Sequence, residues 1–159
     1  MKLSYLITFF LFIIITNSFG AGSSGSDTKS SYDKAVKFIE VAKKNEKKEK
    51  NEKAIKNYKK ALKLLIESNN KKPNNADTLN YLGFTSRKLG DYNAGEKYYL
   101  QGLALEPKHN GINEYLGELY VATNRIDLAK ERLKVLETCN CEEYAELNDI
   151  IMGIKKSKY

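Results

Sequence analysis

The strongest constraint on the fold of this chain is a 34-residue recurrence centred on residues 75–107. This segment predicts two helices joined by a sharp turn at Gly90-Asp91, with Asn74 or Asn75 capping the first helix and Pro107 following the second. The landmarks return 34 positions later, where Leu82-Gly83 becomes Leu116-Gly117, Gly95 becomes Ala129, Tyr99 becomes Leu133 and Gly102 becomes Leu136. The turn becomes Asn124-Arg125, and Asn tolerates the left-handed backbone that Gly adopts freely. A fixed period of this length indicates stacked helix pairs.

Small residues in the central unit predict close contact between its two helices. Gly83, Gly95 and Gly102 stand where the helices would approach, and Leu79, Leu82, Tyr99 and Leu103 would fill the space between them. A glycine inside a helix costs about 0.5–1 kcal/mol relative to alanine. Two glycines in one helix therefore indicate that close packing matters there.

The unit before the central one is longer. Ala54, Tyr58 and Ala61 answer Gly95, Tyr99 and Gly102 at an offset of 41. The seven additional residues amount to about two helical turns, so the apolar face keeps its phase. We expect a long helix from Asn51 to about Asn69, paired with a helix over residues 31–47 that offers Phe38, Val41 and Ala42.

The last stretch of the chain predicts half a unit. One further period carries the apolar positions to Leu147, Ile150 and Ile154, in a helix expected from Glu142 to about Lys156. Ile151 stands where Gly83 and Gly117 are small, which fits a helix that admits no partner behind it. A stack of repeats needs such a terminal cap.

The spacings resemble the tetratricopeptide repeat family over about residues 35–154. Relative to that family's pattern, Leu79 replaces Trp, Ser86 replaces Tyr, Gly95 replaces Ala and Tyr99 replaces Phe. The resemblance implies an all-α fold, a short right-handed superhelix of about three helix pairs with a C-terminal capping helix. The domain would span 32–156, with repeat units at 35–75, 76–109 and 110–141 and the capping helix at 142–156.

The resemblance also implies a concave groove lined by the first helix of each pair. The groove candidates are Asn80, Phe84, Arg87, Glu114, Glu118 and Val121, with Asp77, Ile39 and Lys43 beside them. Such a mixed surface suits an extended peptide or a helix of a protein partner. The alternative is that these positions are only the solvated faces of amphipathic helices.

A family subtype that clamps a C-terminal carboxylate with Lys, Asn and Arg does not carry over. Its places hold Tyr81, Gly111 and Tyr115. The helical spacing of Tyr92, Tyr98, Tyr99, Tyr115 and Tyr120 favours packing between helices over a sugar or cofactor surface.

The net charge of +7 comes almost wholly from lysine, with arginine only at positions 87, 125 and 132. Nucleic-acid and phosphate sites more often recruit arginine for bidentate contacts, so we expect no nucleic-acid partner. The dense run Lys43–Lys50 is interrupted by acids and predicts a solvated surface, with an anionic partner as the alternative.

Residues 1–20 have the form of a signal peptide. Lys2 precedes an apolar run over 5–15, and Ser18-Phe19-Gly20 places small residues before a cut ahead of Ala21. The run is shorter than the roughly 20 residues of a membrane span, and no Cys lies near the cut for lipid attachment. We expect an exported, periplasmic protein without a stable membrane anchor after cleavage; an uncleaved N-terminal anchor is the alternative. Residues 21–31 predict a disordered Gly/Ser linker.

Cys139 and Cys141 flank one residue in the link before the capping helix. In an exported protein two cysteines usually form a disulfide. Their Cα atoms lie up to about 7 Å apart in an extended chain, so we expect a bridge to be strained. A soft-metal site, with paired thiolates for Cu(I), and a redox dithiol are the alternatives.

The sequence shows no catalytic constellation, no phosphate-binding glycine loop and no set of metal ligands. Its single histidine, His109, follows Pro107 in a loop where exposure is expected. The sequence therefore predicts a non-enzymatic scaffold without a cofactor that binds a protein or peptide. A thiol- or copper-handling role for Cys139 and Cys141 is the alternative, and self-association through the first helix pair is a third possibility.

Overall fold

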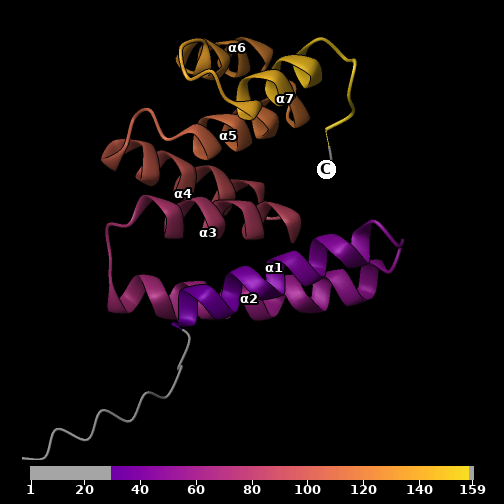
Figure 1. Cartoon of the computed structure of the whole chain (residues 1–159), viewed down its shortest axis with the longest axis vertical. Coiled ribbons are helices and arrows are strands. Elements are labelled where there is room, and N and C mark those ends of the chain that lie inside the picture. The colour runs from indigo at the N-terminus through magenta and orange to yellow at the C-terminus, as the bar shows by residue number, and fades with distance from the viewer. Residues whose placement is uncertain (1–29, 158–159) are drawn as a thin grey trace, which may run out of the picture.

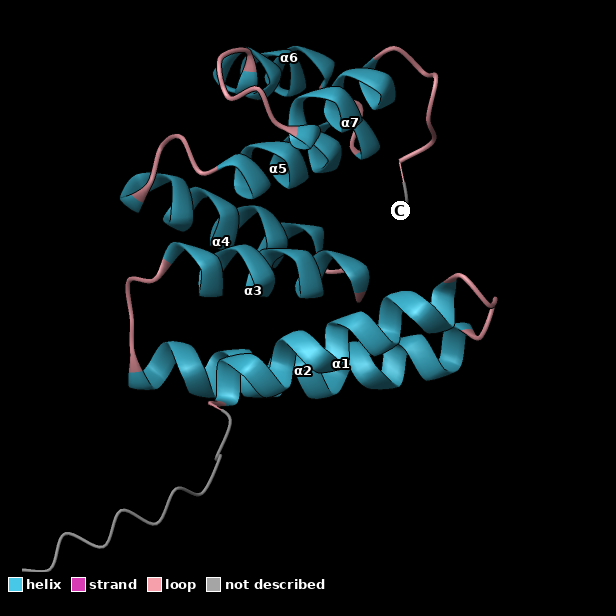
Figure 2. Cartoon of the chain, in the orientation of Figure 1, coloured by secondary structure: helices cyan, strands magenta, loops and turns pink. Residues whose placement is uncertain are grey.

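The computed structural model describes residues 30–157. The expected signal peptide and the expected linker up to residue 29 lie outside this range. Within it, all regular secondary structure is helical (Figures 1 and 2). The seven helices of this part of the chain are α1 (Ser31–Glu46), α2 (Asn51–Lys71), α3 (Ala76–Lys88), α4 (Tyr92–Leu105), α5 (Asn110–Ala122), α6 (Ile126–Leu136) and α7 (Glu142–Ile151).

The helices form three antiparallel pairs and a single terminal helix, as the repeat arithmetic predicts. α1 packs on α2, α3 on α4 and α5 on α6. The second helix of each pair contacts the first helix of the next element, and α7 packs on both α5 and α6. Figure 1 shows the pairs stacked in chain order, with the α1/α2 pair at one end and α6 and α7 at the other. None of the helices described is long and apolar enough to cross a membrane.

The turns confirm the predicted left-handed positions. Gly90 has φ +87° and Asn124 has φ +60°, each directly after the C-cap residue of the first helix of its pair. Asn75 rather than Asn74 caps α3, with its side chain accepting the amide of Thr78 at 2.7 Å.

α1 begins at Ser31, where the helix predicted over residues 31–47 also begins, so Ser31 belongs to this helix and not to the expected linker. Ser30 and Asp33 form a reciprocal capping box, in which the Asp33 amide donates to Ser30 Oγ at 3.1 Å and the Ser30 amide donates to Asp33 Oδ2 at 3.2 Å. Because this cap satisfies two of the otherwise unpaired amides, the helix begins at Ser31.

The additional length of the first unit lies in α2, as predicted. α2 has 21 residues and α4 has 14. Ala54, Tyr58 and Ala61 are buried, as are Gly95, Tyr99 and Gly102 at the matching places. The prediction for α1 is partly wrong. Val41, expected in the core, is exposed, and Ile39, expected beside the groove, lies in the core. The buried stripe of α1 is Ala35, Ile39 and Ala42, which keeps the expected Ala42 but runs through Ile39 where Phe38 and Val41 were expected.

The glycines provide the close contacts that the sequence predicts. A Cβ atom added to Gly83 would lie 2.5 Å from Tyr99 Cε1 and 2.8 Å from Tyr99 Cζ. A Cβ atom at Gly95 would lie 3.1 Å from the carbonyl oxygen of Gly83. One period later, a Cβ atom at Gly117 would lie 2.5 Å from Leu147 Cδ2, so α7 fills the space above α5.

The capping helix is shorter than predicted. α7 ends at Ile151 because Gly153 adopts φ +71° and the amides of Ile154 and Lys155 fold back to the carbonyl of Asp149. Leu147 and Ile150 are buried as expected, but Ile154 lies beyond the helix and is 71% exposed.

Candidate functional groove

The floor of the candidate groove is aromatic. Phe84 of α3 and Tyr115 of α5 lie with ring centroids 5.2 Å apart, and Tyr58 of α2 meets Phe84 edge-on at 6.0 Å. Burial, aided by Glu114 and Glu118, raises the pKa of Tyr115 above its ordinary value. Three helix pairs therefore contribute rings to one aromatic platform.

A lysine lies above this floor. The Nζ atom of Lys43, on α1, lies 4.5 Å from the centroid of Phe84 and 5.9 Å from that of Tyr115. A cation over an aromatic face is attracted by the ring's quadrupole, by about 0.5–1 kcal/mol where the site is exposed. Lys43, which the sequence places beside the candidate groove, lines the cavity above these rings.

Charged side chains surround the platform. Lys88 of α3 and Glu46 of α1 form an ion pair of 2.7 Å, and the Tyr58 hydroxyl donates to Glu46 Oε2 at 3.0 Å. The resulting cavity has a volume of about 690 Å³. It is lined by Lys43, Glu46, Lys47, Asn51, Phe84, Lys88, Glu114, Tyr115 and Glu118.

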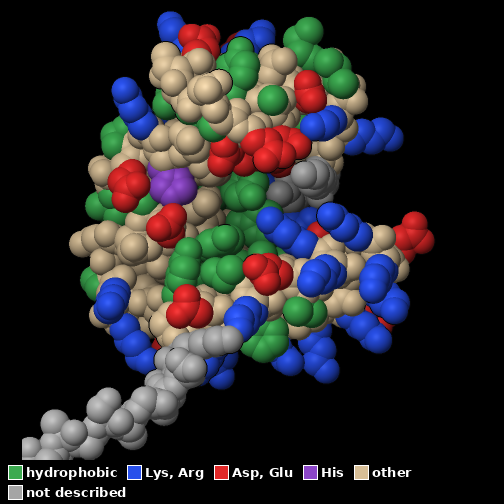
Figure 3. Space-filling model, in the orientation of Figure 1, with side chains coloured by type: hydrophobic (Ala, Val, Ile, Leu, Met, Phe, Trp, Pro, Cys, Tyr) green, Lys and Arg blue, Asp and Glu red, His purple; other side chains and the backbone are tan. Residues whose placement is uncertain are grey.

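In Figure 3 the hollow lies on one side of the molecule, with Lys and Arg side chains gathered below it over the α1/α2 pair and Asp and Glu side chains above it. Hydrophobic side chains lie between the two. The cavity therefore combines an apolar floor with walls of opposite charge. This chemistry suits a peptide segment that carries an apolar residue beside charged ones.

Three of the six groove candidates line this cavity, namely Phe84, Glu114 and Glu118. Phe84 is only 2% exposed, so it meets the cavity with a small part of its ring. Val121 is half-buried and lies away from the cavity. Asn80 is buried beneath α5, where its Nδ2 lies 2.9 Å from the point that a Cβ atom on Gly111 would occupy. Its assignment as a ligand contact is therefore corrected.

Arg87 is also corrected, from a ligand anchor to a structural residue. Its side chain is fully shielded, and it donates to the carbonyl oxygen of Tyr115 at 2.7 Å and to Glu118 Oε2 at 3.3 Å. The guanidinium group thus joins α3 to α5 beneath the groove. It holds Tyr115 in place and presents no accessible surface to a ligand.

Sequence reasoning missed Glu46, Lys47, Asn51 and Lys88 as lining residues. Each lies at the α1/α2 turn or at the end of α3. Glu46 and Lys88 carry opposite charges. Their separation in the sequence is one residue more than the 41-residue offset between the first and the central unit, so the sequence itself shows this spacing. The α1/α2 turn contains no glycine, so the sequence does not mark its register.

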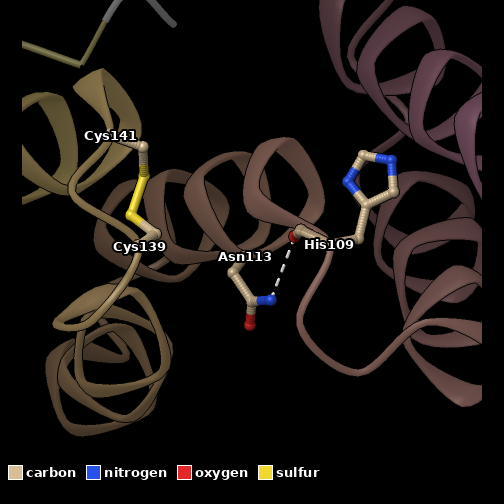
Figure 4. Close-up of a disulfide and its surroundings, with 4 residues drawn as sticks. All are labelled: His109, Asn113, Cys139 and Cys141. Carbon is tan, nitrogen blue, oxygen red and sulfur yellow. Dashed lines mark hydrogen bonds between the residues drawn. A yellow bond between two sulfur atoms is a disulfide. The ribbon is translucent and has the colours of Figure 1, made fainter.

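Cys139 and Cys141 form a disulfide (Figure 4). Their Cα atoms are 5.2 Å apart, within the ordinary range for a bridge. The chain achieves this because Asn140 takes a left-handed φ of +49°, so the expectation of an extended, overlong span is wrong. Both sulfur atoms are in the bridge and offer no thiolate pair for copper. Within residues 30–157 no group of three or more His, Cys, Asp or Glu side chains is placed to hold a metal ion.

The expectation that His109 is exposed is also wrong. His109 is the N-cap of α5, where its Nδ1 accepts the amide of Ile112 at 3.2 Å, and its Nε2 lies 3.1 Å from Asp77 Oδ1 on α3. If Nδ1 accepts, Nε2 carries the hydrogen and donates it to Asp77. The carbonyl oxygen of His109 in turn accepts from the Asn113 side chain at 3.0 Å (Figure 4). His109 thus fixes the start of α5 against α3.

Comparison with known proteins supports the repeat interpretation of the central pair. Residues 76–109, which comprise α3, α4 and their turn, match the family model of the tetratricopeptide repeat. Among solved structures, the chain is similar to the first TPR of Spaghetti (RPAP3), solved bound to the HSP90 peptide SRMEEVD. The two are 22% identical with a TM-score of 0.48, and the alignment covers 79% of this chain and 96% of that one. None of the curated proteins compared with this chain matches it.

Proposed function

We propose that this chain is a non-catalytic interaction module that binds a segment of another protein in the groove between α1, α3 and α5. The observation that carries the proposal is the cavity of about 690 Å³ with Phe84 and Tyr115 as its floor. The match of residues 76–109 to a repeat family built of stacked helix pairs is consistent with it.

The groove favours a short segment over a small molecule. Its apolar floor is formed by two rings, and its walls carry lysines from α1 and carboxylates from α5. A peptide segment with one apolar side chain between an acidic and a basic one would complement the apolar floor, the lysines and the carboxylates. Because the helices are packed before the ligand arrives, binding requires little ordering of the module itself.

The cellular role we propose is that of a scaffold in the cell envelope, reached through the signal peptide expected at residues 1–20. Detection of the mature protein in the periplasmic fraction, with its N-terminus at Ala21, would support this. Retention of the full-length chain in the cytoplasm would contradict it.

The groove is tested with peptides selected by the full chain from a displayed random library. Their affinity is then measured by fluorescence anisotropy for the wild type, for Lys47→Glu and for Glu114→Lys. Both substitutions reverse charges on the cavity wall without touching Arg87. Lys97→Glu, on the outer face of α4, is the matched control.

We expect at least about a tenfold loss of affinity in one of the two groove variants and less than about twofold in the control, since a charge reversal at a desolvated contact costs more than 1.4 kcal/mol. Equal affinity for the wild type and both groove variants would contradict the proposal that the peptide binds in the groove.

A further inference from the structure

The helical pair at the N-terminal end differs in charge from the rest of the chain. Residues 31–72, which contain α1 and α2, hold 14 lysines and six acidic residues. Residues 73–157 hold ten basic and 13 acidic residues. The positive net charge of the described chain is thus confined to one end of the stack. A lysine content raised evenly by composition would not give this separation.

Lysines dominate the middle of the outward face of α2. Lys56, Lys59 and Lys63 are exposed and follow one another within two turns. Within residues 30–157, none of these three side chains has a carboxylate oxygen within 4.0 Å of its Nζ atom. Lys60 beside them lies over the ring of Phe38 of α1, 5.2 Å from its centroid. The acidic residues of α2, Glu52 and Glu67, lie toward its ends, so the centre of the face is positive.

Two isoleucines lie along one edge of this face. Ile55 and Ile66 are 44% and 42% exposed. They are eleven residues apart, a separation of three full helical turns plus a rotation of about 20° around the axis. The two side chains therefore lie nearly on one line parallel to the helix axis. An edge of exposed branched apolar side chains beside a row of lysines is the pattern by which a helix lies on a lipid surface.

The position in the stack leaves this face open. α2 packs on α1 and on α3, and within residues 30–157 no further helix covers its outer side. Figure 1 shows the α1/α2 pair forming one end of the molecule. The face is a convex helix surface about 30 Å long, given a rise of about 1.5 Å per residue. It therefore fits a plane better than it fits a groove-filling ligand.

We propose that the outer face of α2, with Lys56, Lys59, Lys63, Ile55 and Ile66, docks on the surface of a bilayer that contains anionic lipids. Lysine suits this role because attraction to a charged plane needs no bidentate geometry. A symmetric dimer through the same face would bring like charges together and is disfavoured. The contact is peripheral and shares no residue with the groove.

The test is sedimentation of the full chain with two kinds of vesicle, one of phosphatidylglycerol and phosphatidylcholine in equal parts and one of phosphatidylcholine alone. The readout is the ratio of the two partition coefficients, because the apolar run at residues 5–15 contributes to both. The test variant is Lys56→Gln/Lys59→Gln/Lys63→Gln. The control, Lys97→Gln/Lys108→Gln/Lys130→Gln, removes the same charge from exposed positions elsewhere.

We expect the wild type to prefer the anionic vesicles, and the ratio to fall at least about tenfold in the test variant and less than about threefold in the control. High salt should also lower the ratio, because exposed charges are screened. Unchanged circular dichroism and thermal unfolding confirm that both variants are folded. Ile55→Ser/Ile66→Ser should weaken the binding that remains at high salt.

Two results would overturn the proposal. One is an equal fall of the ratio in both triple variants, which would mean that overall charge alone acts. The other is the absence of any preference for anionic vesicles while soluble polyglutamate binds through Lys56, Lys59 and Lys63. That outcome would assign the face to an acidic protein.

Discussion

Arg87 of α3 and Glu118 of α5 form an ion pair at 3.3 Å in which 0% and 2% of the two side chains are exposed. The pair joins the first helices of two successive units. Arg87 makes a second bond, to the carbonyl oxygen of Tyr115 at 2.7 Å. The repeat pattern assigns both partners to the ligand surface. Burial makes Arg87 part of the support beneath that surface, whereas Glu118 lines the cavity with the small part of its side chain that stays exposed.

Removal of one partner of this pair should be strongly destabilising. Arg87→Met leaves the Glu118 carboxylate buried without its cation, and we expect a loss of about 3 kcal/mol in the free energy of unfolding, measured in urea. The matched control is Arg125→Met, which breaks the more exposed pair with Glu96 at 2.8 Å and should cost about 1 kcal/mol or less. Similar losses in both variants would show that burial of the Arg87 pair is energetically unimportant.

The contact between Gly83 and Tyr99 predicts that a single methyl group is costly. Gly83→Ala places Cβ against a fully buried ring, and we expect a loss of about 1–3 kcal/mol despite the better helix propensity of alanine. Gly111→Ala is the control, since the one close approach of its Cβ, at 2.9 Å, is to the amide nitrogen at the end of the Asn80 side chain, and its contact with His109 Cε1 at 3.6 Å is an ordinary one. Adding Tyr99→Leu to Gly83→Ala should recover part of the loss in thermal unfolding. No recovery would locate the strain elsewhere.

The Cys139–Cys141 bridge closes a very small loop, so it should add little to global stability. We expect Cys139→Ser/Cys141→Ser to lower the free energy of unfolding by less than about 2 kcal/mol. Thiol titration of the purified chain should find no free thiol before reduction. Free thiols that bind Cu(I) tightly under native isolation would instead support the thiol- or copper-handling interpretation.

Alkaline pH should unfold the chain through its buried tyrosines. Burial, then the neighbouring Tyr81 and Asp77, raises the pKa of Tyr32 to about 12, and burial also raises the pKa of Tyr58, Tyr99 and Tyr115. Each group is neutral in both states below pH 10, so its contribution is fully present there.

Above pH 10 the unfolded chain loses these protons first, and stability falls as pH rises toward the folded pKa values. Urea midpoints should therefore be flat up to about pH 10 and decline beyond it. Tyrosinate absorbance should rise together with loss of helix. Ionisation of the buried tyrosines without loss of helical structure would contradict this mechanism.

Helix pairs and their contacts could be predicted from sequence because packing depends on spacing. Spacing alone predicts that Gly83 and Tyr99 lie between the paired helices, where they meet each other. The same arithmetic matches Ala54 and Tyr58 to Gly95 and Tyr99, and both are buried. The seven-residue extension of α2 was likewise readable, because two whole turns preserve the apolar phase.

The depth of the groove residues could not be predicted in the same way. Helical phase predicts which side of α3 carries Asn80 and Arg87. It does not predict that α5 packs against that side and buries both residues. The length of an arginine side chain also lets it turn inward to a carbonyl oxygen of the next unit. Lys43 reaches Phe84 from α1, a contact between units that a single repeat pattern does not contain.

The contact between Leu147 and Gly117 has a consequence for the order in which the chain matures on the ribosome. In the central unit the space above Gly83 is filled by Tyr99, which follows it by only 16 residues. In the third unit the corresponding space above Gly117 is filled by Leu147 of α7, which follows it by 30 residues. Because chains begin to fold during synthesis, the first two units can close while α5 still exposes an open seam. A nascent chain interrupted before residue 147 should therefore present a distinct target to chaperones and proteases.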